Sequence, residues 1–369
     1  MLGRRLAIVL PDLRPGGAEK LRLALAREWT SAGIGVDFVL RREQGALLDE
    51  LPAVARVVNL GAKRVRHMIP GLFRYLRTER PDALLAAMWP LTVVAPLVAR
   101  LAGYRGPVLI SEHAPQSLAY SARGRVHGLL MRLSMRLIYP LADARVAVSS
   151  GVADDMARLS GMRRDAFEVI HNPAATGRVL DRGGWGLPIP AADAPMILTV
   201  GTLKPVKRHD LLIRAFARLP QRDARLCIVG EGPERARLEA LAGELGVADR
   251  IMLPGYQPDP SPWYAHADLF VLTSAYEGFG NVIVEALEQG TPVVSTDCPF
   301  GPREILEDGK YGTLVPMGDA DALTAAMAEA LSRPHDRSAL RRRASEFSVE
   351  RAAAAYARLM FPGDAQGAK

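Results

Sequence analysis

The stretch ADLFVLTSAYEGFGNVIVEALEQGTPVVSTD, residues 267–297, decides the fold that this sequence predicts. It begins with the apolar run Ala267–Ser274, ends with the apolar run Thr291–Asp297, and has a helical pattern between them. Short continuous apolar runs that alternate with helices are typical of parallel sheets covered on both faces. The stretch therefore predicts a strand, a helix and a second, parallel strand.

The same alternation extends along the whole chain. Its 369 residues exceed what one hydrophobic core usually organises, so we expect two α/β domains, each with a doubly wound parallel sheet. The periodicity breaks in residues 174–195, which are rich in Gly, Pro and Ala. This predicts an N-terminal domain over residues 1–178 and a C-terminal domain over 179–369, the latter including a terminal helix at 349–360. The predicted strands are RLAIVL, GVDFVL, VARVVNL, DALLAAM, PVLISEH, ARVAVSS, FEVIHNP, MILTVG, RLCIVG, RIMLPG, ADLFVLTS, PVVSTD and GTLVP.

Three features bear on the cellular compartment. The apolar run near the start, in MLGRRLAIVLPDLR, is too short for a secretory signal, so we expect the first strand there. Residues 83–99 carry no charge, but they fall just short of a spanning helix and contain Pro90 and Pro96, which favours a buried strand followed by a buried helix. Cys227 and Cys298 lie far apart, which indicates a reducing compartment and argues against a disulfide or zinc scaffold.

The two halves of the chain differ in charge. Residues 1–180 hold 26 Lys and Arg against 15 Asp and Glu, a net charge of +11, whereas residues 181–369 hold 21 against 25, a net charge of −4. A basic half suits nucleic acid, anionic lipid or a phosphorylated substrate, and a solvated arginine-rich surface gives the same count. Few aromatic residues interleave with the arginines, so we do not expect nucleic-acid binding.

Candidate site residues follow the apolar runs, because ligands of open parallel sheets bind outside the carboxyl ends of the strands. Gly16 and Gly17 follow the first run and suit close approach of an anion at a helix start, although a plain tight turn is equally open. His113 follows PVLISE and is suited to hydrogen-bond a sugar or leaving group near neutral pH; the alternative is a histidine satisfied by a neighbouring loop. Lys207 and Arg208 precede a helix, where cations oppose the helix dipole unless an anion such as a diphosphate lies between them. A solvated basic loop is the alternative there.

The middle of the opening stretch has the layout of a nucleotide-sugar site. Residues 278–281, GFGN, are expected to begin a helix whose first N–H groups hold phosphate oxygens. Glu277 then reaches sugar hydroxyls on one side of a diphosphate, and Glu285 reaches a ribose diol on the other. The alternative is that Glu285 is an exposed carboxylate, but its helix is apolar nearly all round, and a buried carboxylate without a partner is costly.

An ordered set of motifs over nearly the whole chain resembles glycosyltransferase family 4, a retaining group. The motifs are PGGAE, SEH, AVSSGVADDM, VIHNP, VGTLKPVKRHDLLIRAF, IVGEGPERARLEALA, LPGY, EGFGNVIVEALEQGTPVVSTDCPFGPREIL and DGKYGTLVP. The resemblance implies the GT-B fold, in which two Rossmann-like doubly wound domains face each other and a C-terminal helix crosses back to the N-terminal domain.

The resemblance also assigns roles within the site. Glu277 and Glu285 match the family's E-x7-E motif, whose first glutamate binds the donor sugar and whose second binds the ribose. His113 would lie beside the donor sugar at the reaction centre. Family members commonly carry an arginine where this chain has Thr202, and Lys204 or Arg208 is the candidate replacement. We therefore expect catalytic roles for His113 and Glu277 and donor-binding roles for Gly16, Gly17, Lys207, Arg208, Gly278, Phe279, Gly280, Asn281, Val282 and Glu285.

No metal or other cofactor is expected. Helix amides and Lys207 would stabilise the leaving diphosphate directly. In the Asp-x-Asp sequence at residues 319–321 we expect Asp319 to cap a helix rather than to bind a metal ion.

The acceptor is expected on the basic N-terminal half. In residues 123–138 the apolar Val126, Leu129, Leu130, Leu133 and Leu137 fall on one helical arc, and Arg125, Arg132 and Arg136 line its flank. Core packing with solvated arginines is one interpretation. With the GT-B resemblance we favour contact with an anionic membrane and a polyprenyl-diphosphate-linked acceptor, hence a cytoplasmic protein peripheral at the inner face of the membrane.

The expected function is a retaining glycosyltransferase that moves a sugar from a nucleotide-sugar to a glycan or lipid-linked saccharide in surface polysaccharide biosynthesis. A UDP-sugar donor is favoured, and GDP-mannose remains open. Two alternatives are a GT-B nucleotide-sugar epimerase, which needs no acceptor surface, and a non-catalytic carbohydrate-binding module, which needs no intact set of Glu277, Glu285, Lys207 and His113.

Overall fold

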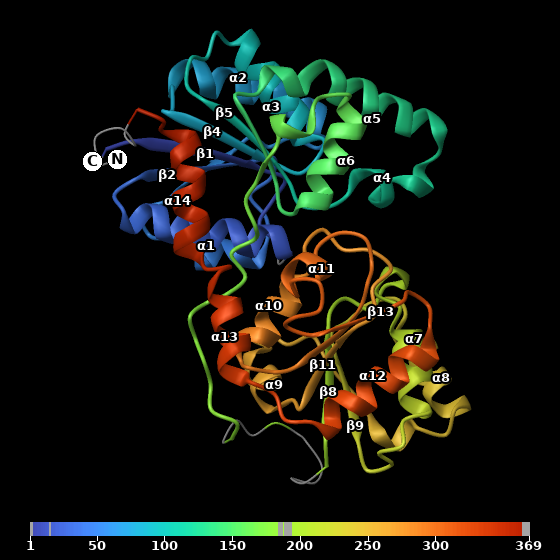
Figure 1. The fold of residues 1–369 in the computed structure, drawn as a ribbon. Helices are drawn as coiled ribbons and strands as arrows, with labels where there is room; N and C mark the ends of the chain where they lie inside the picture. The colour runs from blue at the N-terminus through green and yellow to red at the C-terminus, as the bar shows by residue number, and fades with distance from the viewer. Residues whose placement is uncertain (1–2, 15, 184–186, 188–193, 364–369) are drawn as a thin grey trace. The chain divides into compact units, whose positions relative to one another are not determined.

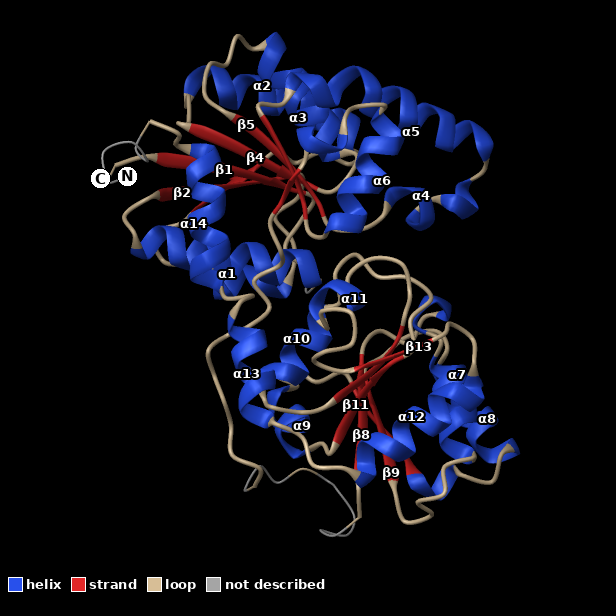
Figure 2. Ribbon diagram, viewed as in Figure 1, coloured by secondary structure: helices blue, strands red, loops and turns tan. Residues whose placement is uncertain are grey.

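The chain forms two compact units (Figure 1). The structure is a computed structural model and describes residues 3–14, 16–183, 187 and 194–363. Unit 1 contains Met1–Pro173 together with Val349–Lys369, and unit 2 contains Ala174–Ser348. In each unit helices flank a parallel β-sheet, as Figure 2 shows by colour.

The sheet of unit 1 has the strand order β3-β2-β1-β4-β5-β6-β7, and all its pairings are parallel. The chain builds outward from β1 in one direction and then returns to β4 on the other side, so the strand order reverses between β1 and β4. The strands are β1 (Arg5–Leu10), β2 (Gly35–Leu40), β3 (Arg56–Asn59), β4 (Ala83–Ala87), β5 (Val108–Glu112), β6 (Ala144–Ala147) and β7 (Glu168–Val169). The helices are α1 (Gly17–Ser31), α2 (Ile69–Thr78), α3 (Leu91–Leu101), α4 (Gln116–Ala119), α5 (Arg125–Ile138), α6 (Ser150–Ser160) and α14 (Val349–Met360).

Both faces of the unit 1 sheet are buried under helices. Successive strand residues point to opposite faces, so each strand supplies side chains to two cores. Along β1, Leu6, Ile8 and Leu10 join the core under α1 and α14, whereas Ala7 and Val9 join the core under α2 and α3. Every one of these side chains is fully buried. This explains why the strand sequence is continuously apolar rather than alternating.

Unit 2 repeats the architecture with the strand order β10-β9-β8-β11-β12-β13, again all parallel. Its order reverses between β8 and β11. The strands are β8 (Met196–Val200), β9 (Arg225–Val229), β10 (Ile251–Gly255), β11 (Leu269–Leu272), β12 (Val293–Thr296) and β13 (Thr313–Val315). The helices are α7 (His209–Ala217), α8 (Arg235–Glu244), α9 (Ser261–His266), α10 (Asn281–Glu288), α11 (Pro302–Ile305), α12 (Ala320–Ser332) and α13 (Arg337–Ser345).

The predicted strands are all present, and residues 83–99 form β4 followed by α3, as expected. Asp319 caps α12, since its side chain accepts a hydrogen bond from the N–H of Ala322 at 2.9 Å. Cys227 and Cys298 are buried free thiols. Within the described residues, no helix combines the length and the apolar character needed to cross a membrane.

The assignment of residues 179–369 to one domain is corrected for the terminal helix. The side chains of Ala353, Tyr356 and Met360 on α14 are buried in the core of unit 1, and the indole Nε1 of Trp29 on α1 donates to the backbone oxygen of Ala353 at 3.1 Å. The last helix therefore completes the first unit, as the GT-B resemblance implied. Unit 2 begins at Ala174, slightly before the predicted boundary, and much of the predicted linker (184–186 and 188–193) lies outside the described residues.

Candidate functional site

The strand reversal in unit 2 brings two of the predicted donor-site residues together. Lys207 ends the short 3₁₀ helix that follows β8, and Glu277 lies in the loop that follows β11. The Lys207 Nζ donates to Glu277 Oε1 at 2.6 Å, and the Ser274 hydroxyl donates to the same oxygen at 2.6 Å. Both charged side chains are largely buried, with 19% and 12% exposed. A cation and a carboxylate are thus held at the position where open parallel sheets bind their ligands.

The loop from Glu277 to α10 is shaped by glycine. Gly280 is the N-cap of α10 with φ of 103°, a conformation that favours glycine, and the helix begins at Asn281. The predicted helix start at residues 278–281 is therefore too early, because this conformation at Gly280 interrupts the helix. The side chain of Phe279 is buried and packs edge-to-face on Phe347, with ring centroids 5.4 Å apart, so only its backbone is left for a ligand.

Glu285 is held by a residue that the sequence analysis missed. The buried Tyr264, on α9, donates its hydroxyl to Glu285 Oε2 at 2.7 Å. Burial, and then the Glu285 charge, raise the pKa of Tyr264 well above its usual value, so the hydroxyl keeps its proton. Glu285 is neither the fully exposed carboxylate of the alternative nor a buried one without a partner. Nothing local distinguishes Tyr264 from an ordinary core tyrosine, so only the packing of α9 on α10 identifies it.

The predicted replacements for the missing arginine are less well placed. Arg208 pairs with Asp210, with its Nε 3.1 Å from Oδ1, and Lys204 is exposed. The cations before α7 thus find protein anions, Glu277 for Lys207 and Asp210 for Arg208. This explains how the basic segment is tolerated at a helix start.

In unit 1, Gly16 and Gly17 lie just after β1, beside the strand reversal. Gly16 is the N-cap of α1, and Gly17 is its first residue. A Cβ on Gly16 would lie 2.2 Å from an Oε of Glu19, which is the end of a flexible side chain that can move aside, so this contact does not by itself require glycine. Burial raises the pKa of Glu19.

His113 follows β5 and lies in a buried polar network. Its Nε2 is 2.9 Å from Nη2 of Arg22 on α1 and 3.2 Å from the Ser111 hydroxyl. The Tyr356 hydroxyl, from α14, is 2.9 Å from that of Ser111 and accepts from Arg22 Nη2 at 3.2 Å. Burial, and then the Arg22 charge, hold the pKa of His113 well below its usual 6.5. The sequence predicted His113 but neither Arg22 nor Tyr356.

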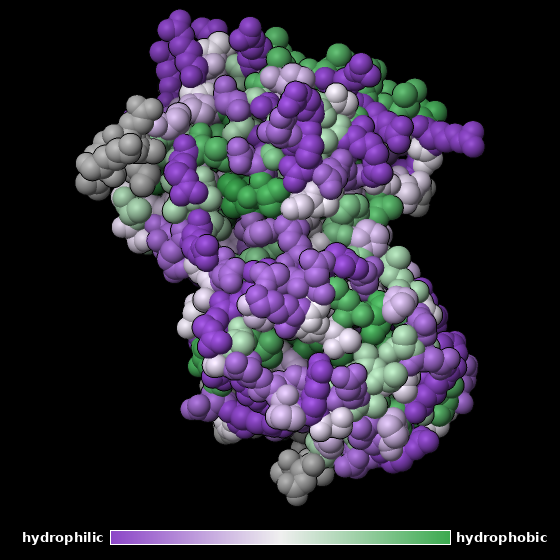
Figure 3. Space-filling view, in the orientation of Figure 1, coloured by the Kyte–Doolittle hydropathy of each residue, from purple (hydrophilic) through white to green (hydrophobic). Residues whose placement is uncertain are grey.

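The amphipathic helix α5 presents its apolar arc to solvent. Only Met131 and Met135 on this helix are fully buried. The residues of the predicted arc are exposed, namely Val126 (74%), Leu129 (67%), Leu130 (59%), Leu133 (50%) and Leu137 (61%). Figure 3 shows hydrophobic surface beside hydrophilic side chains where α5 lies in Figure 1. The core-packing interpretation of this arc is therefore wrong.

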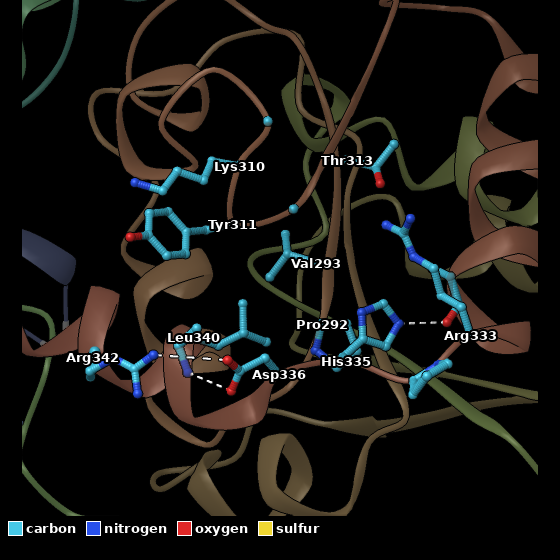
Figure 4. A pocket seen from close by; sticks show the side chains of 15 residues that line it. Pro292, Val293, Lys310, Tyr311, Thr313, Arg333, His335, Asp336, Leu340 and Arg342 are labelled. Carbon is cyan, nitrogen blue, oxygen red and sulfur yellow. Dashed lines mark hydrogen bonds and ion pairs between the residues drawn. The ribbon is translucent and has the colours of Figure 1, made fainter.

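A separate pocket of about 490 Å³ lies at the other end of the unit 2 sheet (Figure 4). Its lining includes Val293 and Thr313, the first residues of β12 and β13. Arg342 in its wall donates to Ser338, and Lys310 pairs with Glu307. This pocket is not the predicted donor site, which lies at the carboxyl ends of β8 and β11.

Comparison with known proteins identifies the family. Residues 15–178 match the family model described as Glycosyltransferase Family 4, and residues 189–347 match the model described as Glycosyl transferases group 1. Over 361 residues the chain is 32% identical to a lipopolysaccharide core biosynthesis glycosyltransferase of Rhizobium meliloti (strain 1021), a match that covers 94% of this chain and 96% of that one. The chain belongs to glycosyltransferase family 4.

Further relatives of this glycosyltransferase support the assignment. Over 227 residues the chain is 32% identical to a Campylobacter jejuni enzyme named N-acetylgalactosamine-N,N'-diacetylbacillosaminyl-diphospho-undecaprenol 4-alpha-N-acetylgalactosaminyltransferase. This match covers 62% of this chain and 61% of the relative. The solved structure of the lipopolysaccharide outer core galactosyltransferase WaaB superposes with a TM-score of 0.73 at 20% identity, over 97% of this chain and 99% of WaaB. At that identity the likeness concerns the fold, and it confirms the predicted GT-B fold.

No group of three or more His, Cys, Asp or Glu side chains suited to a metal ion occurs in the part of this glycosyltransferase that the structure describes.

Proposed function

We propose that this glycosyltransferase moves a sugar, with retention of anomeric configuration, from a nucleotide-sugar to a glycan or polyprenyl-diphosphate-linked acceptor in surface polysaccharide biosynthesis. The observation that carries the proposal is the Lys207–Glu277 pair at the strand reversal of unit 2, with Glu285 held by Tyr264 on the neighbouring helix. Lys207 faces the donor diphosphate, Glu277 the sugar hydroxyls and Glu285 the ribose diol.

The residues around this pair suit a departing nucleoside diphosphate. As the glycosidic bond breaks, negative charge develops on the diphosphate and positive charge on the anomeric carbon. The first N–H groups of α10, from Asn281 and Val282, and the ammonium of Lys207 stabilise the leaving group without a metal ion. Gly278 and Gly280 keep side chains away from the loop before those amides. His113 contacts the donor sugar.

A UDP-sugar is the favoured donor. The Campylobacter relative is named as an N-acetylgalactosaminyltransferase, and a Salmonella typhimurium relative that is 33% identical over 190 residues is named as a lipopolysaccharide 1,6-galactosyltransferase. A mycobacterial relative is named as GDP-mannose-dependent, which keeps GDP-mannose as the competing donor.

The acceptor surface is α5, and the protein acts peripherally at the inner face of the cytoplasmic membrane. An exposed apolar arc flanked by Arg125, Arg132 and Arg136 suits the boundary between acyl chains and anionic headgroups. The same arginines attract the diphosphate of a lipid-linked acceptor. The name of the Campylobacter relative includes such an acceptor, a diphospho-undecaprenol-linked saccharide.

A thermal-shift screen of the purified protein against UDP, GDP, ADP, CMP and their sugar conjugates, in EDTA and again with Mg²⁺, tests the donor site. A ligand that binds only the native state raises Tm according to its affinity and concentration. We expect UDP and a UDP-sugar each to raise Tm, and each ligand to raise it by the same amount in EDTA as in Mg²⁺. Stabilisation only with Mg²⁺ would contradict the metal-free site, and no response to any nucleotide would contradict the donor site.

Turnover then separates the proposal from its rivals. With the stabilising nucleotide-sugar and a lipid-linked acceptor we expect a glycosylated acceptor and free nucleoside diphosphate. Conversion of the nucleotide-sugar without acceptor would identify an epimerase, and binding with neither outcome would identify a carbohydrate-binding module.

A further inference from the structure

The network around His113 contains an unusual cation. Arg22 has no exposed surface, and among the residues that the structure describes no carboxylate pairs with it. Its Nε and Nη1 also have no hydrogen-bond partner among those residues. A buried charge without a counter-ion is costly, so a position for such a residue calls for a function. The guanidinium is stacked on the ring of Tyr356, 4.9 Å from its centroid, and directs Nη2 at His113.

The chemistry of this contact fixes the donor and the acceptor. A guanidinium only donates hydrogen bonds and remains protonated in proteins. The 2.9 Å contact therefore requires a lone pair on Nε2 of His113. In a neutral imidazole with a lone pair on Nε2, the proton is on Nδ1.

The remaining contacts have one consistent set of directions. Arg22 Nη2 also donates to the Tyr356 hydroxyl at 3.2 Å. That hydroxyl can then donate to Ser111 Oγ at 2.9 Å, and Ser111 can donate to Nε2 at 3.2 Å. Every proton in the ring of contacts then points toward Nε2 of His113. A proton on Nε2 would point at the N–H of Arg22, and Ser111 would have to accept a hydrogen bond from the ring instead of donating one.

We propose that Arg22 acts as a positioning residue, which with Ser111 and Tyr356 holds His113 as the neutral Nδ1–H tautomer, so that His113 donates a hydrogen bond to the substrate and does not shuttle a proton. Three elements supply this network, α1, β5 and α14. The terminal helix therefore contributes to the chemistry of a residue far from it in sequence.

The groups that face His113 from the other elements favour a neutral ring, except Asn172, whose side-chain hydrogen bond favours the charged ring. Arg22 on α1 is cationic and disfavours a second positive charge beside it. Tyr356 on α14 and Ser111 on β5 contribute hydroxyls rather than carboxylates. No described carboxylate contacts His113 to offset the Arg22 charge.

Nitrogen NMR of the ligand-free protein labelled with ¹⁵N-histidine tests the tautomer directly. The chain has seven histidines, and the His113 signals are those absent from the spectrum of the His113→Asn variant. We expect a protonated Nδ1 and an unprotonated Nε2 at pH 7. A wild-type ring that is protonated on Nε2, or that titrates between pH 6 and 7, would overturn the proposal.

Variants separate the network from simple packing. In Arg22→Met the ring should protonate at higher pH and gain the Nε2–H tautomer, because Ser111 can then accept from it. Arg22→Lys, which keeps a donor and a charge, should preserve the wild-type tautomer. Tyr356→Phe, which keeps the ring under the guanidinium, should shift the tautomer only in part. An unchanged tautomer in a folded Arg22→Met protein would show that Arg22 does not set it.

The catalytic role rests on the proposed function, and turnover tests it separately. The amide of an asparagine places an N–H near the position of Nδ1 but cannot shuttle protons. A proton shuttle would contribute about 10²–10⁴-fold to the rate. We therefore expect kcat of His113→Asn within about tenfold of wild type and kcat of His113→Ala well below it. Equal losses in both variants would refute the hydrogen-bond role, whereas a protein without any transfer activity would refute the proposed function and leave the NMR result standing.

Discussion

Lys207 and Glu277 form an ion pair in the ligand-free chain, and in the proposed donor site the same contact would hold both side chains ready for a donor. A diphosphate would attract the ammonium and free the carboxylate for sugar hydroxyls. Because the pair is largely buried, removal of one partner would leave the other charge buried without a counter-ion, which is unfavourable.

Glu277→Gln should strongly reduce transfer in a chain that still folds. The amide keeps the shape of the side chain and its contact with Ser274 but no longer holds a charge opposite Lys207. We expect kcat/KM to fall by about 10²-fold or more, as on removal of a preorganised group that stabilises the transition state. Steady-state kinetics would measure the loss of activity, and a thermal melt would show whether the variant is folded. Wild-type turnover in a folded variant would exclude Glu277 from the donor site.

Tyr264→Phe should weaken binding of the nucleotide specifically. The substitution keeps the buried ring but removes the hydroxyl that donates to Glu285, so the carboxylate loses its orientation. A hydrogen bond to a charged group contributes about 1.5–3 kcal/mol, so we expect roughly tenfold or greater loss of UDP affinity by calorimetry, with KM for the acceptor unchanged. Unchanged UDP affinity would show that Tyr264 has only a packing role.

His209 should make the stability of unit 2 depend on pH. Burial, and then Lys207, lower the pKa of this residue in the folded state to about 4, and the side chain is only 4% exposed. In the unfolded chain a histidine titrates near pH 6.5, so between these values the unfolded state binds more protons and stability falls as the pH falls. The loss should approach about 3 kcal/mol near pH 4. Melts of His209→Gln should show a shallower decline in Tm from pH 7 to 4.5, and parallel declines would contradict the assignment.

At the scale of elements, α5 is the exception to the rule that an amphipathic helix buries its apolar face. Its two buried methionines hold it to the unit, and its leucines remain outside. The sequence predicted the arc and its arginine flank but could not say which face turns inward, because that depends on how α3 and α6 pack on the helix.

Replacing Arg125, Arg132 and Arg136 by glutamine should weaken binding to anionic vesicles. Each arginine near an anionic surface contributes about 1 kcal/mol, so we expect roughly 100-fold weaker binding by co-sedimentation, with UDP affinity unchanged. The matched control replaces Arg74, Arg77 and Arg80, three exposed arginines on or beside α2 of the same unit. Equal losses in both triple variants would indicate general charge attraction rather than a membrane site on α5.

The strands were predictable because a doubly covered parallel sheet needs continuous apolar runs, and those runs are local in sequence. Local information failed where backbone conformation or tertiary contact decides. The positive φ of Gly280 moves the start of α10 to Asn281, and no periodicity reveals it. Tyr264 and Arg22 became visible only when their partners Glu285 and His113 were located in space.

At the scale of the whole molecule, the chain order and the units do not coincide. The last helix belongs to unit 1, where Met360 is fully buried in the core that β1 and α1 share. The core of unit 1 is therefore complete only when the terminal helix, which follows unit 2 in the sequence, packs on the first 173 residues.

Met360→Ala should destabilise unit 1 selectively. Truncation of a buried methionine costs about 2–5 kcal/mol, and the lost contacts all belong to that core. We expect faster amide exchange in peptides from β1 and β2, measured by mass spectrometry, with exchange in β8 and β9 little changed. The matched control is Met327→Ala on α12, which is equally buried in the core of unit 2 and should give the reverse pattern. If Met360→Ala instead exposed unit 2 alone, the terminal helix would belong to the second domain, as its position in the sequence first indicated.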